Sequence, residues 1–280
     1  VVAPCIRPKP GLPMCPLFID ASVSMLELKK IESFFPEQLR HFKRNLLREY
    51  LQYKILEAVF ASRYGQKLVF MGGTAIHIVH GLPRFSEDLD FDNRGLTQDD
   101  FSALTQGVAK KLALEGYVIQ TSTSFKGAFS ADIKVMGVLF DEGLSGHQDE
   151  KILIKLDAQP QNFKYSAQRV VINKFDVFTS ISVVPVDILL AQKFYAILAR
   201  KRAMGRDFYD AVFLAGKAKS DFAYLKERAG IADKEMLKLA LLERCAKLDF
   251  KLLSRDVEQF IFFPEDAKKV LLFMEYVREW

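Results

Sequence analysis

Two aspartates, Asp88 and Asp90, stand two positions apart in a segment that alternates acidic and apolar residues. Because successive side chains point to opposite faces of a strand, both carboxylates are expected to project from one face. Neighbouring carboxylates repel each other unless a cation lies between them, and Mg²⁺ accepts one or two carboxylates together with substrate phosphates. The pair therefore predicts a site for Mg²⁺, with Mn²⁺ as an alternative ion.

A third acid from a neighbouring strand would complete a two-metal site, which stabilises both the attacking and the leaving oxygen of an in-line displacement. Asp157 is the preferred candidate because it closes the apolar run 152–156. Asp132 could fill the same role, and the sequence leaves this alternative open. The predicted metal ligands are therefore Asp88, Asp90 and Asp157.

A phosphate site is predicted upstream of these acids, where an apolar run at 67–71 ends in Gly72, Gly73 and Thr74. A helix expected over 75–80 follows, so its first backbone N–H groups would be free to bind phosphate oxygens. The glycines permit close approach because they lack side chains, and the threonine could add a hydroxyl donor. A glycine pair alone is usually a turn, and a D-x-D alone is usually a solvated strand edge. Their combination in a strand–turn–helix–strand arrangement favours nucleotide chemistry.

Two residues just ahead of the acids, Arg84 and Ser86, could contact nucleotide phosphates. The alternative for Arg84 is an ion pair with Glu87. Farther along the chain, Lys193 lies on an expected helix whose other face is apolar. Its ammonium group could offset the charge that develops on a triphosphate, whereas the alternative is a solvated lysine on an amphipathic helix.

Two more acids, Asp207 and Asp210, stand three positions apart, so on a helix they share one face. Asp207 could also cap the start of its helix and be purely structural. The spacing alone does not decide between these two roles.

The elements that must position these residues follow from hydrophobic periodicity and from glycine and proline breaks. In the first half we expect helices over 36–64, 75–80 and 98–115, and strands over 67–71, 88–92, 117–125, 129–140, 150–158 and 168–173. After Pro185 we expect helices alone, over 186–203, 206–217, 221–229, 233–247, 249–261 and 266–278. The predicted organisation is a disordered or extended leader at 1–20, an α/β domain at 21–184 and a helical domain at 185–280.

Composition narrows the class of protein. Half of the residues are hydrophobic, so a sizeable core can form and a disordered chain is excluded. The net charge of +5 and the basic clusters at 40–48 and 200–206 favour a polyanionic partner. The three cysteines show no metal-ligand spacing and fit a reduced compartment. We find no membrane-spanning run or signal peptide pattern, so the expected location is the cytoplasm.

Two separated motifs give the chain a resemblance to a known family. Residues 72–76 (GGTAI) match a GG[ST]-A-[IL] opening, and residues 84–91 (RFSEDLDF) match an R-x-S-x-D-[IL]-D-F strand. Residues 193–200 and 205–210 look like a K-x-x-A…R-x-K-x-R-D-x-x-D helix pair. From about residue 37 to 217, the chain closely resembles the AbiEii/AbiGii-type toxins, a branch of the DNA polymerase β-like nucleotidyltransferase superfamily.

The resemblance implies an α+β fold, in which a polymerase β-like nucleotidyltransferase core with a mixed sheet is followed by a helical C-terminal domain. It implies a Mg²⁺-dependent enzyme that transfers NMP from an NTP to RNA, in related toxins often the acceptor end of tRNA. It also implies neutralisation by a partner antitoxin. It places Asp207 beside Lys193, which that aspartate would orient.

The residue roles that follow from the motifs and from the resemblance form two sets. The catalytic set is Asp88, Asp90, Asp157, Lys193 and Asp207. The nucleotide-binding set is Gly72, Gly73, Thr74, Arg84, Ser86 and Lys193.

Two other functions remain open from the sequence. Sugar-nucleotide glycosyltransferases also use a D-x-D motif with a metal, although the glycine pair close ahead of the motif argues against this class. A catalytically silent module that binds RNA or a partner is the second alternative, because a fold does not fix a function. The intact acids count against it.

Overall fold

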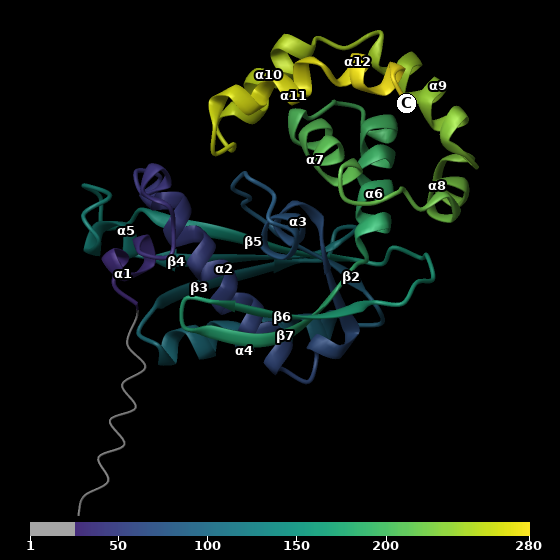
Figure 1. Cartoon of the computed structure of the whole chain (residues 1–280). Helices are drawn as coiled ribbons and strands as arrows, with labels where there is room; N and C mark the ends of the chain where they lie inside the picture. The colour runs from purple at the N-terminus through teal and green to yellow at the C-terminus, as the bar shows by residue number, and fades with distance from the viewer. Residues whose placement is uncertain (1–25) are drawn as a thin grey trace, which may run out of the picture.

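The structure is a computed structural model that describes residues 26–280. The predicted leader at 1–20, with Cys5 and Cys15, lies outside the described residues. Within the described part, a seven-stranded mixed sheet is built from the first part of the chain, and the last part is helical (Figure 1). The predicted fold class, a mixed α/β half followed by helices, is confirmed.

The sheet has the strand order β3-β4-β5-β2-β1-β7-β6. Its strands are β1 (Leu68–Met71), β2 (Leu89–Asn93), β3 (Val118–Ser124), β4 (Phe129–Met136), β5 (Lys151–Gln159), β6 (Gln168–Lys174) and β7 (Val177–Val183). The pairs β1–β7 and β2–β5 are parallel, and the remaining neighbours are antiparallel. The strand that leads into the glycines, β1, and the strands that carry Asp90 and Asp157, β2 and β5, therefore lie together at the centre.

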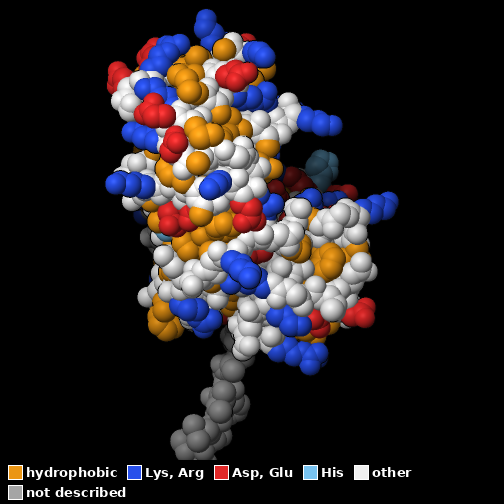
Figure 2. All heavy atoms as spheres, turned by 90° about the vertical axis from the view of Figure 1, so that its right-hand side faces the viewer, with side chains coloured by type: hydrophobic (Ala, Val, Ile, Leu, Met, Phe, Trp, Pro, Cys, Tyr) orange, Lys and Arg blue, Asp and Glu red, His pale blue; other side chains and the backbone are white. Residues whose placement is uncertain are grey.

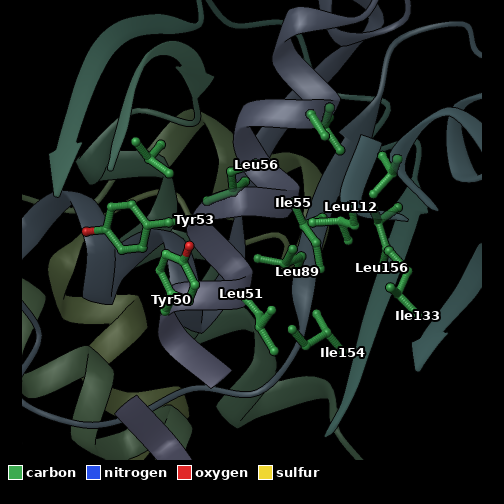
Figure 3. Close-up of a cluster of buried hydrophobic side chains, with 14 of the residues drawn as sticks. Tyr50, Leu51, Tyr53, Ile55, Leu56, Leu89, Leu112, Ile133, Ile154 and Leu156 are labelled. Atoms are coloured by element: carbon green, nitrogen blue, oxygen red, sulfur yellow. The ribbon is translucent and has the colours of Figure 1, made fainter. Parts of the chain in front are cut away.

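One face of the sheet is covered by two long helices, α2 (Lys43–Ala61) and α4 (Gln98–Leu114). Figure 3 shows Leu51 and Ile55 of α2 packed toward Leu89 of β2 and Ile154 of β5, all fully buried. Because side chains alternate along a strand, burial of Leu89 on this face sends Asp90 to the opposite face. The hydrophobic pattern of the strands thus determines on which side the acids stand.

The opposite side of the sheet carries a second hydrophobic cluster, formed mainly by the helical half. Val69, Ile76 and Leu82 of the sheet half pack into this cluster with residues of the later helices. Those helices are α6 (Val186–Ala199), α7 (Gly205–Ala215), α8 (Phe222–Ala229), α9 (Lys234–Cys245), α10 (Phe250–Glu258), α11 (Lys268–Leu271) and α12 (Phe273–Arg278). The helical half consequently lies on the side of the sheet to which the acids point (Figure 1).

Backbone hydrogen bonds also join the segment ahead of the acids to the end of the chain. The Phe85 amide donates to the Phe260 carbonyl at 2.7 Å, and the Phe262 amide donates to the Pro83 carbonyl at 3.1 Å. Arg84 forms an antiparallel bridge with Ile261. Residues 260–262 thus act as a short strand partner for residues 83–85.

The remaining elements are short. They are the helices α1 (Leu28–Glu32), α3 (Gly72–His80) and α5 (Val138–Asp141), and the 3₁₀ turns η1 (Glu37–Leu39), η2 (Gly65–Lys67) and η3 (Pro264–Ala267). None of the described helices is both long and apolar enough to cross a bilayer. On the face drawn in Figure 2, Lys and Arg side chains are interspersed with Asp and Glu over both halves.

Several expectations from the sequence differ from the structure. The strand expected over 129–140 ends at Met136 and is followed by α5, and the helix expected over 75–80 begins at Gly72. The first long helix begins at Lys43 rather than at Pro36, because a 3₁₀ turn occupies Glu37–Leu39. Strand β7 was missed, since its Thr and Ser residues weaken the apolar signal. The helix expected over 266–278 is broken into η3, α11 and α12. The domain boundary at 184 stays a prediction, because the two halves share hydrogen bonds and packing.

Candidate active site

Three central strands, β5, β2 and β1, place the predicted acids and glycines side by side. Asp90 lies opposite Met71 of β1 on one side and opposite Asp157 of β5 on the other. Asp88 precedes β2 instead of lying within it. We call Asp88, Asp90 and Asp157 the acid triad: Asp90 and Asp157 are register partners on one face of the sheet, and Asp88 stands two residues before Asp90.

The glycines form a close contact between the start of α3 and the acid triad. Gly72 has a φ of 79°, in the left-handed region, and a Cβ at this position would collide with the Asp90 carboxylate. A Cβ on Gly73 would lie 2.5 Å from the Arg84 Nη2 atom. Both positions therefore require glycine. Helix α3 begins at Gly72 with no side-chain cap among the described residues, so its first N–H groups can bind an anion.

Burial and charge repulsion raise the pKa of two carboxyl groups of the acid triad. Burial and the charge of Asp88 raise the pKa of Asp90 to about 6, although Lys193 opposes the rise. Burial likewise raises the pKa of Asp88, and Glu87 and Asp157 add to this effect. These carboxylates are thus held close together with too few cations around them.

The acid triad fits a divalent cation by its donor set. The Oδ1 atom of Asp157 is buried without a hydrogen-bond partner, while its Oδ2 atom lies 3.3 Å from the Lys155 Nζ atom. In residues 26–280, no three His, Cys, Asp or Glu side chains converge closely enough to form a complete metal site. Two carboxylates and substrate phosphates suffice for Mg²⁺, so this set can hold the ion once a nucleotide supplies further oxygens.

A cavity of about 480 Å³ opens between the acids and the helical half. Its lining includes Gly72, Gly73 and Asp90 from the sheet half and Lys193 and Asp207 from the helical half. The fold thus brings the two separated motifs to one cavity. Asp88 does not line it among the described residues.

Lys193 belongs to a buried group of four charges, which we call the buried ion cluster: Arg84, Lys193, Asp207 and Asp210. The Lys193 Nζ atom lies 3.0 Å from Asp207 Oδ1 and 2.8 Å from Asp210 Oδ2. Burial alone would lower the pKa of Lys193, but Asp210 and Asp207 outweigh burial and raise it. The lysine is therefore firmly protonated and held at the cavity wall.

Arg84 differs from both sequence-based expectations. Its side chain is 1% exposed, and its Nε and Nη2 atoms each donate to Asp210 at 2.7 Å. The predictions that Arg84 contacts nucleotide phosphates or pairs with Glu87 are both wrong in this structure. Glu87 instead lies 3.2 Å from Arg48. Arg84 links the two halves of the chain and positions the buried ion cluster.

Thr74 and Ser86 also have defined places. Thr74 is fully buried, and its hydroxyl donates to the Asp88 carbonyl. That hydroxyl is therefore already used, which argues against the prediction that it holds the triphosphate. The Ser86 hydroxyl lies beside Gly73, where an added Cβ would be 3.1 Å from it. Ser86 stays a candidate for nucleotide contact.

Several cavity residues were missed by the sequence analysis. They come from the end of β5 and from α6 and α8, and include Gln159, Gln161, Gln192, Tyr195, Arg200, Tyr224 and Arg228. On α6, Lys193, Ala196 and Arg200 recur at steps of three and four residues, which is the one signal in the sequence for this wall. The other walls depend on contacts between distant segments and leave no local pattern.

Comparison with known proteins identifies the family and the fold of this chain. Solved structures with a similar fold include JHP933 from Helicobacter pylori, with 18% identity, a TM-score of 0.54, and coverage of 84% of this chain and 92% of that one. Another is MenT4, a nucleotidyltransferase toxin from Mycobacterium tuberculosis, with 14% identity, a TM-score of 0.56 and 91% coverage of both chains. No curated protein matches the chain. Residues 54–274 match the family described as nucleotidyl transferase AbiEii toxin, type IV toxin–antitoxin system, and the chain therefore belongs to this family of nucleotidyltransferase enzymes.

Proposed function

We propose that this toxin-family nucleotidyltransferase transfers NMP from an NTP to a hydroxyl group of RNA in a Mg²⁺-dependent reaction. The observation that carries the proposal is the shared cavity, in which the start of α3, Asp90 and Lys193 face one space of about 480 Å³. That volume is large enough for a nucleotide, since ligand pockets for small molecules range from about 300 to 1,000 Å³.

In this reaction the acceptor oxygen attacks the α-phosphorus, the bond to the β-phosphate oxygen breaks, and pyrophosphate leaves. The free N–H groups at the start of α3 hold phosphate oxygens. Lys193 offsets the negative charge that develops on the phosphates. Asp207, 3.0 Å from Lys193, keeps that ammonium in place.

Asp88 and Asp90, joined by Asp157, would hold Mg²⁺, or Mn²⁺ as the alternative. When bound, the ion neutralises phosphate charge and lowers the pKa of the attacking hydroxyl. The raised pKa of Asp90, about 6, supports this assignment, because it reflects burial of the carboxyl group together with the charges of Asp88 and Asp157, which a bound cation would offset. In the fully loaded site Asp88, Asp90 and Asp157, together with substrate phosphates, would hold two ions.

RNA is the proposed acceptor, with tRNA the first to test. The net charge of +5 and the arginines near the acids favour a polyanion. Membership of a toxin–antitoxin family supports a cognate antitoxin as the second partner. We propose the cytoplasm as the location, since both RNA and NTP are found there.

The test is incubation of the purified protein with Mg²⁺, total cellular RNA and each of the four α-³²P-labelled NTPs in turn. The expected result is label on RNA from at least one NTP, lost when the metal is chelated. The Asp90→Asn variant, which keeps the side-chain volume, should give no label. Transfer from a labelled UDP-sugar with none from any NTP would contradict the proposal.

A further inference from the structure

The acid triad has two sides, and the nucleotide cavity occupies one of them. Asp90 lines that cavity, whereas Asp88 does not. Two cations lie near Asp88 and outside that cavity: Arg206, 4.0 Å from the adjoining residue Glu87, and Lys155, 3.3 Å from Asp157. A second group of positive charge therefore flanks the acid triad outside the nucleotide cavity.

Two arginines, Arg206 and Arg48, belong to this second group of positive charge. The Arg206 Nη1 atom lies 4.0 Å from Glu87, and the Arg48 Nη1 atom lies 3.2 Å from the same carboxylate. The Arg206 guanidinium stacks over the Phe260 ring at 4.8 Å, which fixes its direction. One acid, Glu87, thus stands between two arginines, next to Asp88 in the chain.

Next to these arginines lies the face of the sheet that α2 and α4 do not cover. Side chains of β3, β4 and β5 that point away from α2 and α4 are exposed or partly exposed, and the polar ones are Gln120, Ser122, Asp132, Lys134, Lys151 and Lys155, with the apolar Val118 and Leu153 between them. Lys155 is 44% exposed and stands two residues before Asp157 on the same face. The face carries three lysines against one acid, Asp132, and it ends at the acid triad.

We propose that the single-stranded 3′ end of the acceptor RNA lies on this face, with Arg206 and Lys155 holding its last phosphodiester beside Asp88. This inference rests on the proposed function and adds to it the place and the chemistry of acceptor binding. The nucleotide then reaches the acids from the cavity and the 3′ hydroxyl reaches them from the opposite side. An in-line displacement requires these two directions of approach.

Arg206 and Lys155 are positioning residues in this arrangement. A phosphodiester held one nucleotide before the end places the terminal hydroxyl at the acids. Guanidinium and ammonium groups bind phosphate through charge-assisted hydrogen bonds. Their removal should weaken acceptor binding without weakening NTP binding, because neither residue lines the nucleotide cavity.

The experiment uses two RNA oligonucleotides of one sequence, which differ only in the last linkage, a natural phosphodiester in one and an uncharged methylphosphonate in the other. Arg206→Gln and Lys155→Gln are compared with the wild type. The matched controls are Arg278→Gln, near the C-terminus, and Lys110→Gln on α4, which covers the other face of the sheet; both side chains are exposed. Thermal melting verifies that each variant is folded.

With the natural oligonucleotide, we expect each test variant to raise the KM for RNA about tenfold, equivalent to about 1.4 kcal/mol. In Arg206→Gln the KM for NTP and kcat should change little. Lys155→Gln also removes the ion pair with Asp157, so its readout is the difference between the two oligonucleotides. With the methylphosphonate, the wild type and the test variants should be equally poor. The controls should match the wild type on both oligonucleotides. Equal losses on the two oligonucleotides, or losses equal to those of the controls, would overturn the inference.

Direct binding separates this inference from the proposed function. Fluorescence anisotropy of the labelled oligonucleotide, without NTP, should show weaker binding by both test variants, with a salt slope smaller by roughly 0.7 for each lost contact. If the wild type transfers no label but binding follows this pattern, the proposed function fails and the acceptor surface stands. If the wild type transfers label to RNA but binding is unchanged in both variants, the acceptor surface fails alone.

Discussion

The acid triad and the buried ion cluster meet at one cavity, yet they compensate their charges in opposite ways. In the buried ion cluster, two cations face two carboxylates at distances of 2.7–3.0 Å. In the acid triad, three carboxylates have one close cation, Lys155, and the pKa of Asp90 is raised to about 6. In the first group each charge has an ionic partner within the protein, whereas in the second the carboxylates outnumber the close cations.

The difference indicates that the buried ion cluster serves mainly stability and that the acid triad serves mainly activity. A charge that is buried and fully paired is costly to disrupt, because the remaining partner stays buried without compensation. A charge that is buried and repelled by its neighbours is costly to keep, so it persists where a ligand neutralises it. Variants of the two groups should therefore fail in different assays.

The largest effect is expected for Asp90→Asn. Loss of one carboxylate from the acid triad should lower NMP transfer by at least roughly a thousandfold, because several kcal/mol of charge stabilisation are lost. Unfolding by urea should show equal or greater stability, since repulsion is relieved. Asp132→Asn, on the same sheet face, is the control and should retain activity; if it does not, Asp132 rather than Asp157 is the third acid.

Arg84→Met should give the opposite result. Removal of Arg84 leaves Asp210 buried with Lys193 alone, and we expect a loss of about 3–5 kcal/mol in the free energy of unfolding. Urea denaturation followed by circular dichroism measures it. The double variant Arg84→Met, Asp210→Leu should recover much of the loss, because no unpaired charge remains. A loss below about 1 kcal/mol would show that the pair behaves as a surface ion pair.

Lys193→Gln tests the residue that belongs to both comparisons, since it lines the cavity and is part of the buried ion cluster. Activity should fall by roughly a hundredfold, as for loss of one donor to a developing charge. Stability should fall less than in Arg84→Met, because Asp210 keeps Arg84 and Asp207 keeps Arg200 at 3.1 Å. Transfer kinetics and urea titrations of Lys193→Gln and Arg84→Met measure the two effects. Equal losses of stability in these two variants would refute the prediction.

The smallest effect concerns pH and a paired acid of the sheet half, Glu49. Burial opposes its charge, but His77 at 2.9 Å and Lys174 at 2.8 Å outweigh burial and hold its pKa below the ordinary value. A lowered carboxyl pKa contributes stability above the unfolded-state pKa, and that stability is lost as the pH falls through the folded-state value. We expect the unfolding free energy of the wild type to fall below about pH 4.5 more steeply than that of Glu49→Gln, by at most about 1.4 kcal/mol per pH unit.

The sequence indicated one of the two charged groups well and the other poorly. Asp88 and Asp90 and the glycine pair lie within a single segment, so strand alternation and turn chemistry reveal them together. Arg84 lies in the same segment, yet its partner Asp210 is 126 residues away. No spacing rule connects such a pair, and the arginine was assigned to phosphates.

Similar reasoning explains the fold-level differences. Long helices and alternating strands follow from local periodicity, and most of them were found. Strand β7 was missed because Thr179 and Ser180 interrupt its apolar pattern, although β6 pairs with it along its whole length. The cavity wall from β5 and α8 could not be predicted, because it exists only when the two halves pack together.

The pairing of residues 83–85 with residues 260–262 has a consequence for control of the enzyme from outside the cavity. Any molecule that moves the segment at 260–262 also moves the backbone three to five residues ahead of Asp88. Inhibition therefore does not require an occupant of the cavity or contact with RNA. A partner that binds only the elements on either side of residues 260–262, α10 and η3, would be enough to displace the acidic groups of the reaction.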